Sequence, residues 1–292
     1  MTRLTIRHET RYSYEKPVGF CPHRLLVRPR DSHATRIVHA SLSFSPAGKT
    51  RWLYDALGNC VCILTPEGQA SELSIVSELV IERFPAPLSP PRIDNPQTAM
   101  PIVYDRCDRL VLDPFIDPVT DDPDGVLLDW VRGQVSRLDE PALDLVLRLN
   151  ASIHGQFDYA ERAEGDARSP AHTIAMGSGA CRDFAWLMVE SLRRLGYAAR
   201  FVTGYLHSPA RSGIRGAGAT HAWCEVFLPD LGWTEFDPTN GLAESSALIP
   251  VAVSRTPEEA SPISGSILGD PGAASLTVQV EVRATDPVKA AA

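Results

Sequence analysis

Residues 177–184, Gly177-Ser178-Gly179-Ala180-Cys181-Arg182-Asp183-Phe184, carry the most definite structural signal in this chain. The four positions before the cysteine hold small residues. Beyond it, apolar residues recur at the i, i+3, i+4, i+7 spacing of a helix with one buried face. Gly196 is typical of the residue that follows a helix C-terminus. We therefore predict a helix over residues 181–195, with Cys181 in its first turn.

A cysteine at this place can act as a nucleophile. The first turn of a helix has unpaired N–H groups and a partial positive charge, and both favour the thiolate form. The same N–H groups could hold an oxyanion, and the small residues before Cys181 let a ligand approach closely. Taken alone, the position also fits a buried structural cysteine, which is the usual environment of a free cysteine.

A nucleophilic cysteine needs a base, and His221 is the candidate because it begins a predicted strand over residues 221–228 beside bulky Trp223. Asp237 ends the next predicted strand, residues 233–237, and could orient the imidazole. Side chains alternate along strands, so His221 and Asp237 lie on the same sheet face only if the numbers of residues paired across the two strands add up to an even number. If His221 paired directly with Asp237, that sum would be 458. An even sum requires a loop with an odd number of residues between the strands, or a bulge. A structural histidine and a turn-forming aspartate remain the alternatives.

Three blocks of sequence together resemble a known family. They are Gly-Ala-Cys181-Arg-Asp-Phe-Ala, His221-Ala-Trp and Gly-Trp-Thr-Glu-Phe-Asp237-Pro-Thr-Asn, which look like those of the bacterial transglutaminase-like cysteine proteins. These proteins belong to the transglutaminase core superfamily, within the papain-like fold. Residues 6–14, 26–30 and 54–59 resemble the N-terminal β domain of this family, and residues 250–265 resemble its C-terminal segment.

The resemblance implies a role for each of the three residues. Cys181 would be the nucleophile, His221 the base and later the acid, and Asp237 the group that orients His221. The acyl group of an amide would pass to Cys181 as a thioester, with the main-chain N–H of Cys181 as an oxyanion donor. Animal transglutaminases have Gln and Trp on either side of this cysteine. Here Ala180 and Arg182 stand there, which argues against carrying over the animal activity.

Three further residues are candidates for supporting or lining the cleft: Asp183, Tyr205 and Trp223. Asp183 could equally just stabilise the helix N-terminus, and the two aromatic residues could equally pack in the core. Arg182 could alter the charge of the cleft or face solvent. Cys224 alternates to the opposite strand face from His221 and is interpreted as structural.

The chain is predicted to be α+β. Residues 1–84 read as an N-terminal antiparallel β domain, and residues 85–150 as a linker, proline-rich at Pro85–Pro91, followed by a helical segment. Residues 151–252 are expected to form a papain-like or transglutaminase-like core, in which the cysteine helix packs against an antiparallel sheet. Residues 253–292 are expected to return to a sheet and to fray at the end.

Composition limits the partners. The chain has a net charge of −8 over 292 residues. It therefore lacks the positive surface that attracts nucleic acids and anionic membranes, and neither is expected as a partner. No apolar run is long enough to span a membrane and the first residues do not resemble a signal peptide, which predicts a cytoplasmic location. Neither a Cys-x-x-Cys pair nor zinc-type spacing occurs, so we expect no metal and no cofactor. The oligomeric state stays open.

The expected function is a cysteine-nucleophile amide hydrolase, a protease or peptide amidase that acts on a peptide or protein. One alternative is an acyl transferase that joins a glutamine carboxamide to an amine. It shares the thioester and differs only in the acceptor. A second alternative is a binding domain on a core without activity. No EF-hand pattern supports a calcium-activated transglutaminase.

Overall fold

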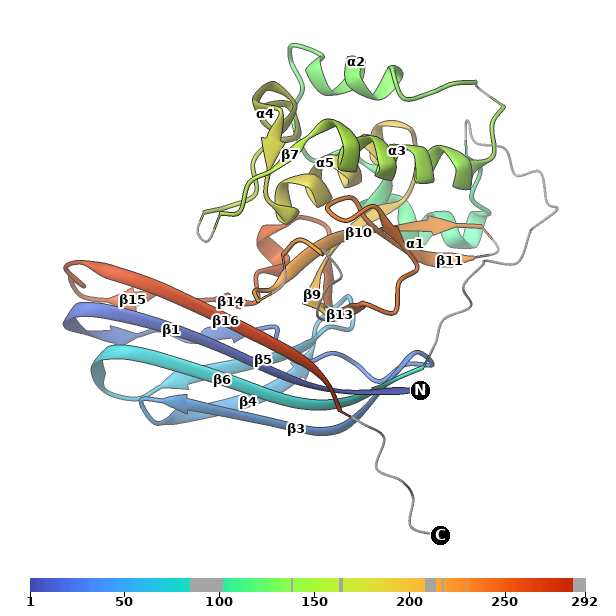
Figure 1. Cartoon of the computed structure of the whole chain (residues 1–292). Coiled ribbons are helices and arrows are strands. Elements are labelled where there is room, and N and C mark those ends of the chain that lie inside the picture. The colour runs from blue at the N-terminus through green and yellow to red at the C-terminus, as the bar shows by residue number, and fades with distance from the viewer. Residues whose placement is uncertain are drawn as a thin grey trace, which may run out of the picture.

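The computed structural model describes residues 1–84, 102–137, 139–162, 165–207, 214–216, 218–229 and 231–285. The predicted proline-rich linker, Pro85–Pro91, lies outside these ranges. A β unit lies beneath a second unit that carries the helices (Figure 1). This arrangement confirms the predicted α+β class.

The β unit contains two antiparallel sheets. The larger has the order β15-β1-β6-β3, with β16 also paired to β1, and the smaller has the order β14-β2-β5-β4. The strands are β1 (Thr2–Phe20), β2 (His23–Leu25), β3 (Thr35–Ser45), β4 (Gly48–Tyr54), β5 (Cys60–Pro66), β6 (Gln69–Arg83), β14 (Ile263–Ser264), β15 (Ile267–Leu268) and β16 (Ala274–Thr285).

The alternation along β1 decides which face of the larger sheet is buried. Leu4, Ile6 and His8 are buried, whereas Arg7 and Arg11 between and beyond them are exposed. The buried face packs on the smaller sheet at one end, through Leu73 and Ile75 among others, and on the helical unit at the other. Charged side chains cover the opposite face, as expected of an antiparallel sheet with one face in water.

The helical unit is built around a third antiparallel sheet, in the order β12-β11-β10-β9-β13. Its strands are β9 (Ala199–Leu206), β10 (His221–Leu228), β11 (Gly232–Asp237), β12 (Leu242–Ala243) and β13 (Leu248–Ser254). The helices are α1 (Arg106–Ile116), α2 (Val126–Arg132), α3 (Ala142–Gln156), α4 (Pro170–Met176) and α5 (Cys181–Arg194), with the short 3₁₀ turn η1 (Glu258–Ala260) and a parallel pair, β7 (Asp158–Tyr159) and β8 (Ser178–Gly179).

Helix α5 is the centre of the main hydrophobic core. Its apolar stripe, including Phe184, Leu187 and Leu192, is fully buried against β9, β10 and α3. The helix is buried on nearly every side because the sheet and the other helices enclose it. That burial fixes the position of its first residue, Cys181.

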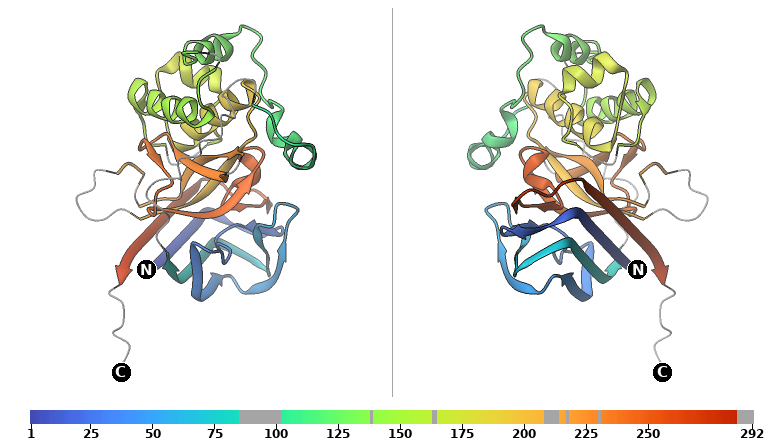
Figure 2. Two further views of the ribbon diagram at one scale, coloured as in Figure 1. Left: turned by 90° about the vertical axis from the view of Figure 1, so that its right-hand side faces the viewer. Right: turned by 90° about the vertical axis from the view of Figure 1, so that its left-hand side faces the viewer.

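Two of the expected domain boundaries fall inside single elements. The boundary at 150/151 lies within α3, and the boundary at 252/253 lies within β13. Helix α3 packs into the core of the helical unit, and β13 belongs to the same unit because it pairs with β9. The residues after η1 instead return to the β unit, where β16 pairs with β1 from Tyr14↔Ala274 to Arg3↔Thr285. The side views show β16 along the rim of that sheet (Figure 2).

An aromatic residue joins the two units. Tyr205, at the end of β9, packs among Leu4, Ile6 and Ile249. Its hydroxyl donates a hydrogen bond to the carbonyl of Val27 (3.0 Å) and lies 3.1 Å from Nδ1 of His8. The larger sheet is therefore held against the helical unit by polar as well as apolar contacts. Among the described helices, none is long and apolar enough to cross a membrane.

Candidate active site

The backbone before α5 turns tightly into the helix. Ala180 is the N-cap residue with extended backbone, and its N–H donates to the Asp183 carboxylate at 2.8 Å. A side chain on Gly179 would meet Asp183 and the Phe184 ring at 2.9–3.0 Å. Position 179 therefore requires glycine, because the strand approaches the helix closely there. This turn places Cys181 at the helix N-terminus, where the sequence predicted it.

Asp183 is a structural anchor beneath this turn. Its carboxylate is fully buried and accepts two hydrogen bonds from the Arg162 guanidinium, both at 3.0 Å, and one from the Arg168 N–H at 2.8 Å. It is not among the described residues that line the cavity. Asp183 thus links Arg162 and Arg168 to the start of α5. These hydrogen bonds give it a role beyond the stabilisation of the helix N-terminus that the sequence suggested.

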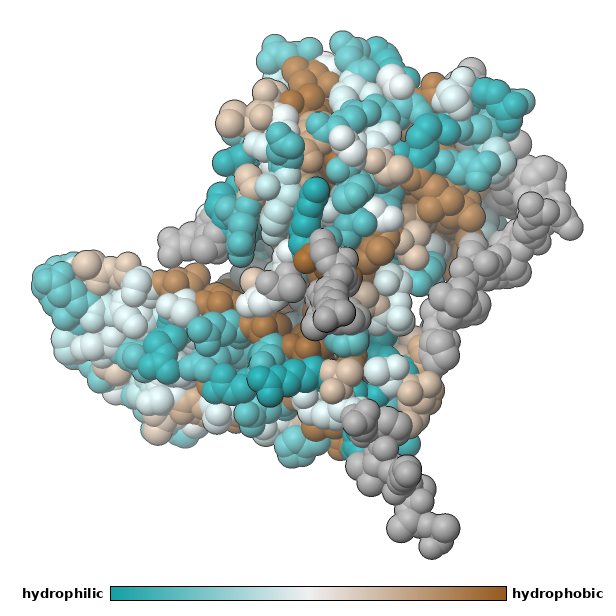
Figure 3. All heavy atoms as spheres, in the orientation of Figure 1, coloured by the Kyte–Doolittle hydropathy of each residue, from teal (hydrophilic) through white to brown (hydrophobic). Residues whose placement is uncertain are grey.

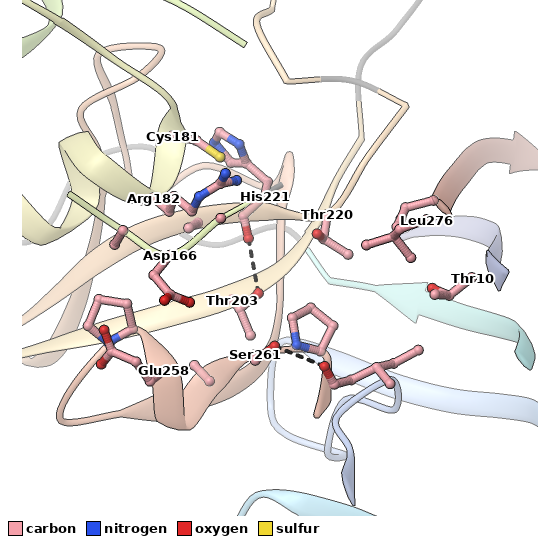
Figure 4. Close-up of a pocket in the computed structure, with 18 of the residues that line it drawn as sticks. Thr10, Asp166, Cys181, Arg182, Thr203, Thr220, His221, Glu258, Ser261 and Leu276 are labelled. Carbon is pink, nitrogen blue, oxygen red and sulfur yellow. Dashed lines mark hydrogen bonds between the residues drawn. The ribbon is translucent and has the colours of Figure 1, made fainter. Parts of the chain in front are cut away.

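Cys181 and His221 lie against each other. His221 begins β10, and its side chain is fully buried. The Cys181 sulfur lies beside the imidazole (Figure 4), and the imidazole and the N–H of Ala222 both act to lower the pKa of the thiol. On the other side of the ring, Nε2 lies 2.9 Å from Oδ2 of Asp237. Nδ1 is therefore the ring nitrogen available to the thiol.

Asp237 is itself held by the turn that follows β11. Oδ1 accepts the N–H of Thr239 at 2.9 Å, and Oδ2 accepts Nδ2 of Asn240 at 2.8 Å. Asn240 also exchanges hydrogen bonds with the backbone of Arg215, in the loop before His221. Sequence reasoning missed Asn240. The signal was present in Asp237-Pro-Thr-Asn240, where short polar side chains favour a turn that bonds to its own backbone.

The electrostatics favour a thiolate paired with an imidazolium. Burial alone would raise the pKa of the Cys181 thiol, but the hydrogen bond and charge of His221 and the Ala222 N–H bring it below its ordinary value. Burial would likewise lower the pKa of His221, but the charge and hydrogen bond of Asp237 raise it to about 10. The pKa of Asp237 is lowered, because His221 and Asn240 outweigh the effect of burial.

Trp223 and Tyr205, candidates for supporting or lining the cleft, do not line the described cavity. Both are buried, and neither is among the residues that line it. The Trp223 ring lies 6.1 Å from that of His221, tilted by 29°, and its indole N–H donates to Glu235 at 3.3 Å. Trp223 therefore packs beside the imidazole from within the core, because odd-numbered side chains of β10 share one face.

A cavity of about 510 Å³ opens at Cys181 and runs between the two units. Figure 4 shows the Cys181 sulfur and the Arg182 guanidinium beside the His221 ring, with Thr10 and Leu276 at the far end. The lining residues come from α5, η1, the strands β1, β9, β10, β14 and β16, and the loops beside them. They are His8, Thr10, Tyr12, Tyr14, residues 165–167, Cys181, Arg182, Phe201, Thr203, residues 220–222, Pro257, Glu258, residues 260–263, residues 274–276 and Val278.

Arg182 and Cys224 lie on opposite sides of the site, Arg182 at the cavity and Cys224 in the hydrophobic core. Arg182 lines the cavity, where burial and the charge of Arg162 lower the pKa of its guanidinium. Cys224 faces the core beneath α5, where burial raises the pKa of its thiol well above the ordinary value. Among the described residues, no group of three or more His, Cys, Asp or Glu side chains is placed to hold a metal ion.

Comparison with known proteins covers both units. Residues 4–82 match the family model of the bacterial transglutaminase-like N-terminal region, and residues 129–238 match that of the transglutaminase-like superfamily. The resemblance inferred from the motifs is thereby confirmed. The second match begins in α2, ahead of the core boundary expected from the sequence.

Relatives of similar length exist in mycobacteria. An uncharacterised protein of Mycobacterium leprae is 27% identical, over 97% of this chain and 99% of its own length. An uncharacterised protein of Mycobacterium tuberculosis is 26% identical, over 96% and 92%. Among solved structures, one described as a "Putative Cysteine Protease" from Cytophaga hutchinsonii has a TM-score of 0.74 at 21% identity, covering 98% of this chain and 92% of that one. That likeness extends the agreement in fold to nearly the whole chain.

Proposed function

We propose that this chain, which belongs to the transglutaminase-like superfamily through residues 129–238, is a cysteine-dependent amide hydrolase. Its membership supports a cysteine-dependent enzyme in general. The observation that carries the finer proposal is the arrangement of three buried residues at a cavity: the Cys181 sulfur lies beside the His221 ring, and the other side of that ring contacts Asp237. Cys181 is the proposed nucleophile, His221 the acid and base, and Asp237 the residue that orients His221.

The first half of the proposed reaction forms a thioester. The Cys181 thiolate attacks the carbonyl carbon of an amide, and the carbonyl oxygen takes the negative charge. The main-chain N–H of Cys181, at the N-terminus of α5, is the proposed donor to that oxyanion. When the carbon–nitrogen bond breaks, His221 gives the Nδ1 proton to the leaving amine, and the acyl group stays on sulfur.

The second half returns the enzyme to its starting state. Water attacks the thioester carbonyl while His221, now neutral, takes a proton from it. The carbon–sulfur bond breaks, the acid leaves, and the thiolate–imidazolium pair is restored. The polar lining supports water as the acceptor, because Arg182, Asp166 and Glu258 share the cavity with Cys181 and give water partners there.

An amine acceptor would make the same thioester the intermediate of an acyl transferase. If the chain were a binding domain without activity, Cys181 would react slowly with electrophiles.

We therefore propose incubation of the protein with short peptide amides, with and without a primary amine, followed by intact-mass spectrometry of protein and products. The Cys181→Ala variant controls for adducts at other positions, and Cys107→Ala removes the exposed thiol.

The outcomes separate the three functions. An acyl adduct on Cys181 released as free acid supports the hydrolase. Release as a new amide only when amine is present would overturn it in favour of the transferase. No adduct, together with slow alkylation of Cys181 by iodoacetamide, would point to the binding domain. A peptide or protein substrate and a cytoplasmic location remain proposals that accompany this one.

A further inference from the structure

Strand β16 forms one rim of the larger sheet and borders the cavity. It pairs with β1 residue for residue from Arg3↔Thr285 to Tyr14↔Ala274, without a register shift. Its other edge faces the space below the helical unit (Figures 1 and 2). In the described part of the chain, that outer edge has no partner strand. An edge of this kind presents a row of backbone donors and acceptors.

One hydrogen bond shows which residues point outward. The N–H of Val280 donates to the carbonyl of Gly218, on the side away from β1, at 2.9 Å. In an antiparallel ladder, alternate residues direct both N–H and C=O to the same side. The backbone groups of Val278, Leu276 and Ala274 therefore also point outward, and among the described residues none accepts or donates a hydrogen bond to them.

The same three residues line the cavity that holds Cys181. Leu276 and Val278 are half-buried and turn their side chains to the same sheet face as Val280, whose side chain packs with Leu4 and Ile6. Figure 3 shows a row of hydrophobic side chains along the upper border of this strand. The outward-pointing backbone and the apolar row therefore run together along one wall of the cavity.

The residues of this edge before Glu281 lack the residue types that usually prevent strand addition. Residues 274–280 include no charged residue, proline or glycine, and the charges begin only at Glu281 and Arg283. By contrast β3, at the opposite rim of the same sheet, has a register shift between Ile37 and His39. Bulges and charges disrupt pairing with other chains, so an unbroken neutral edge is otherwise a hazard for aggregation.

We propose that an extended polypeptide segment binds as an added strand along Ala274–Val278, and that this segment is the part of the substrate that carries the reactive amide to Cys181. This proposal rests on the proposed function and deepens it: the substrate is an unfolded or extended chain rather than a small amide. Five strand residues span about 16 Å. Main-chain hydrogen bonds would give affinity, and contacts with Leu276 and Val278 would favour apolar side chains at alternate positions.

The test uses peptidyl chloromethyl ketones of two to eight residues and measures their second-order rate of alkylation of Cys181. Iodoacetamide, which has no peptide, is the reference. We expect the peptide rate to rise with length and to fall about 3- to 10-fold per removed hydrogen bond when alternate peptide nitrogens are methylated. Methylation of the intervening nitrogens is expected to have little effect, because only every second amide faces β16.

A variant of the protein tests the same contact from the other side. Leu276→Pro removes an outward N–H that β1 does not use, and proline is tolerated at such edge positions. Leu276→Ala is the matched control, because it removes the side chain but keeps the N–H. We expect the alkylation rate of the long peptides, divided by the iodoacetamide rate of the same variant, to fall well further in Leu276→Pro than in Leu276→Ala.

The two proposals fail in different ways. Slow alkylation of Cys181 by iodoacetamide in the parent protein would overturn the proposed function. Fast iodoacetamide alkylation with peptide rates that depend neither on length nor on the position of methylation would overturn the docking strand alone. The methylated peptides need no variant, so this outcome can be reached even if Leu276→Pro fails to fold.

Discussion

His221 and Asp237 meet diagonally across the β10–β11 ladder. The ladder pairs Cys224 with Phe236, so paired residue numbers sum to 460 and not to the 458 that direct pairing would need. The even sum keeps both side chains on one face, and Asp237 is offset by two positions. The 2.9 Å contact from Nε2 to Oδ2 spans this offset. The offset leaves room beside Asp237 for Asn240, which bonds to the same oxygen.

Replacement of Cys181 by alanine is expected to abolish turnover and preserve the fold. Without the thiol no thioester forms, so we expect kcat/KM to fall by at least about 10⁴-fold. Only one buried atom is lost, so Tm is expected to change by less than about 4 °C. Kinetics and calorimetry check the two parts. The matched control is Cys107→Ala, at an exposed cysteine, and retained turnover in Cys181→Ala would eliminate the mechanism.

Loss of the base is expected to cost more than loss of the orienting carboxylate. His221→Ala removes the group that transfers protons, whereas Asp237→Ala leaves an imidazole with a weakened orientation and a lower pKa. We expect kcat/KM to fall further in His221→Ala, with Asp237→Asn closer to the parent than Asp237→Ala because the amide can still contact Nε2. The reverse order would show that Asp237 mainly stabilises the fold.

The pH dependence of turnover is expected to have two limbs. On the acid side, activity falls as pH drops through the lowered pKa of Cys181, because the thiolate becomes a thiol. On the alkaline side, it falls above about pH 10, where His221 loses the proton needed by the leaving amine. Alkylation by iodoacetamide needs only the thiolate, so its rate should stay high above pH 10. If both rates fell together there, unfolding rather than titration of His221 would explain the alkaline limb.

Replacement of Asp183 by asparagine is expected to destabilise the protein. The change removes the charge that holds Arg162 and weakens the acceptor of the Ala180 and Arg168 N–H groups. Breaking a buried ion pair costs about 3–5 kcal/mol, which predicts a fall in Tm on the order of 10 °C. Asp129→Asn, at an exposed ion pair on α2, is the control and should change Tm little. Equal Tm values for the two variants would refute the anchoring role.

The sequence was sufficient for the strongly patterned elements. The apolar spacing after Cys181 predicts α5 within one residue, and the run from His221 to Leu228 coincides with β10. These elements follow from local patterns, since each buries one face and ends at a turn residue. The linear order of Cys181, His221 and Asp237 also indicated the family. The local sequence pattern, however, does not distinguish the residues that line the cavity from those that pack in the core behind it.

Tertiary packing decided which aromatic residues line the cavity and where one unit ends and the other begins. Tyr205 and Trp223 are aromatic residues on neighbouring strands, and only the tertiary packing shows that neither lines the cavity. The expected domain boundary at 252/253 lies inside β13, which pairs with β9 in the sheet of the helical unit. The chain returns to the β unit later, and β16, which begins twenty residues after β13 ends, pairs with β1.

The sequence by itself therefore determined the helix, the strands and the candidate reactive residues, because periodicity and residue chemistry are local properties. Only the tertiary structure decided that the first and last long strands, β1 and β16, form the floor of the cavity opposite Cys181. The paired residues of β1 and β16 lie 260 to 282 positions apart. Such pairing depends on which hydrophobic faces remain uncovered once the core has formed, and no short window of sequence contains that information.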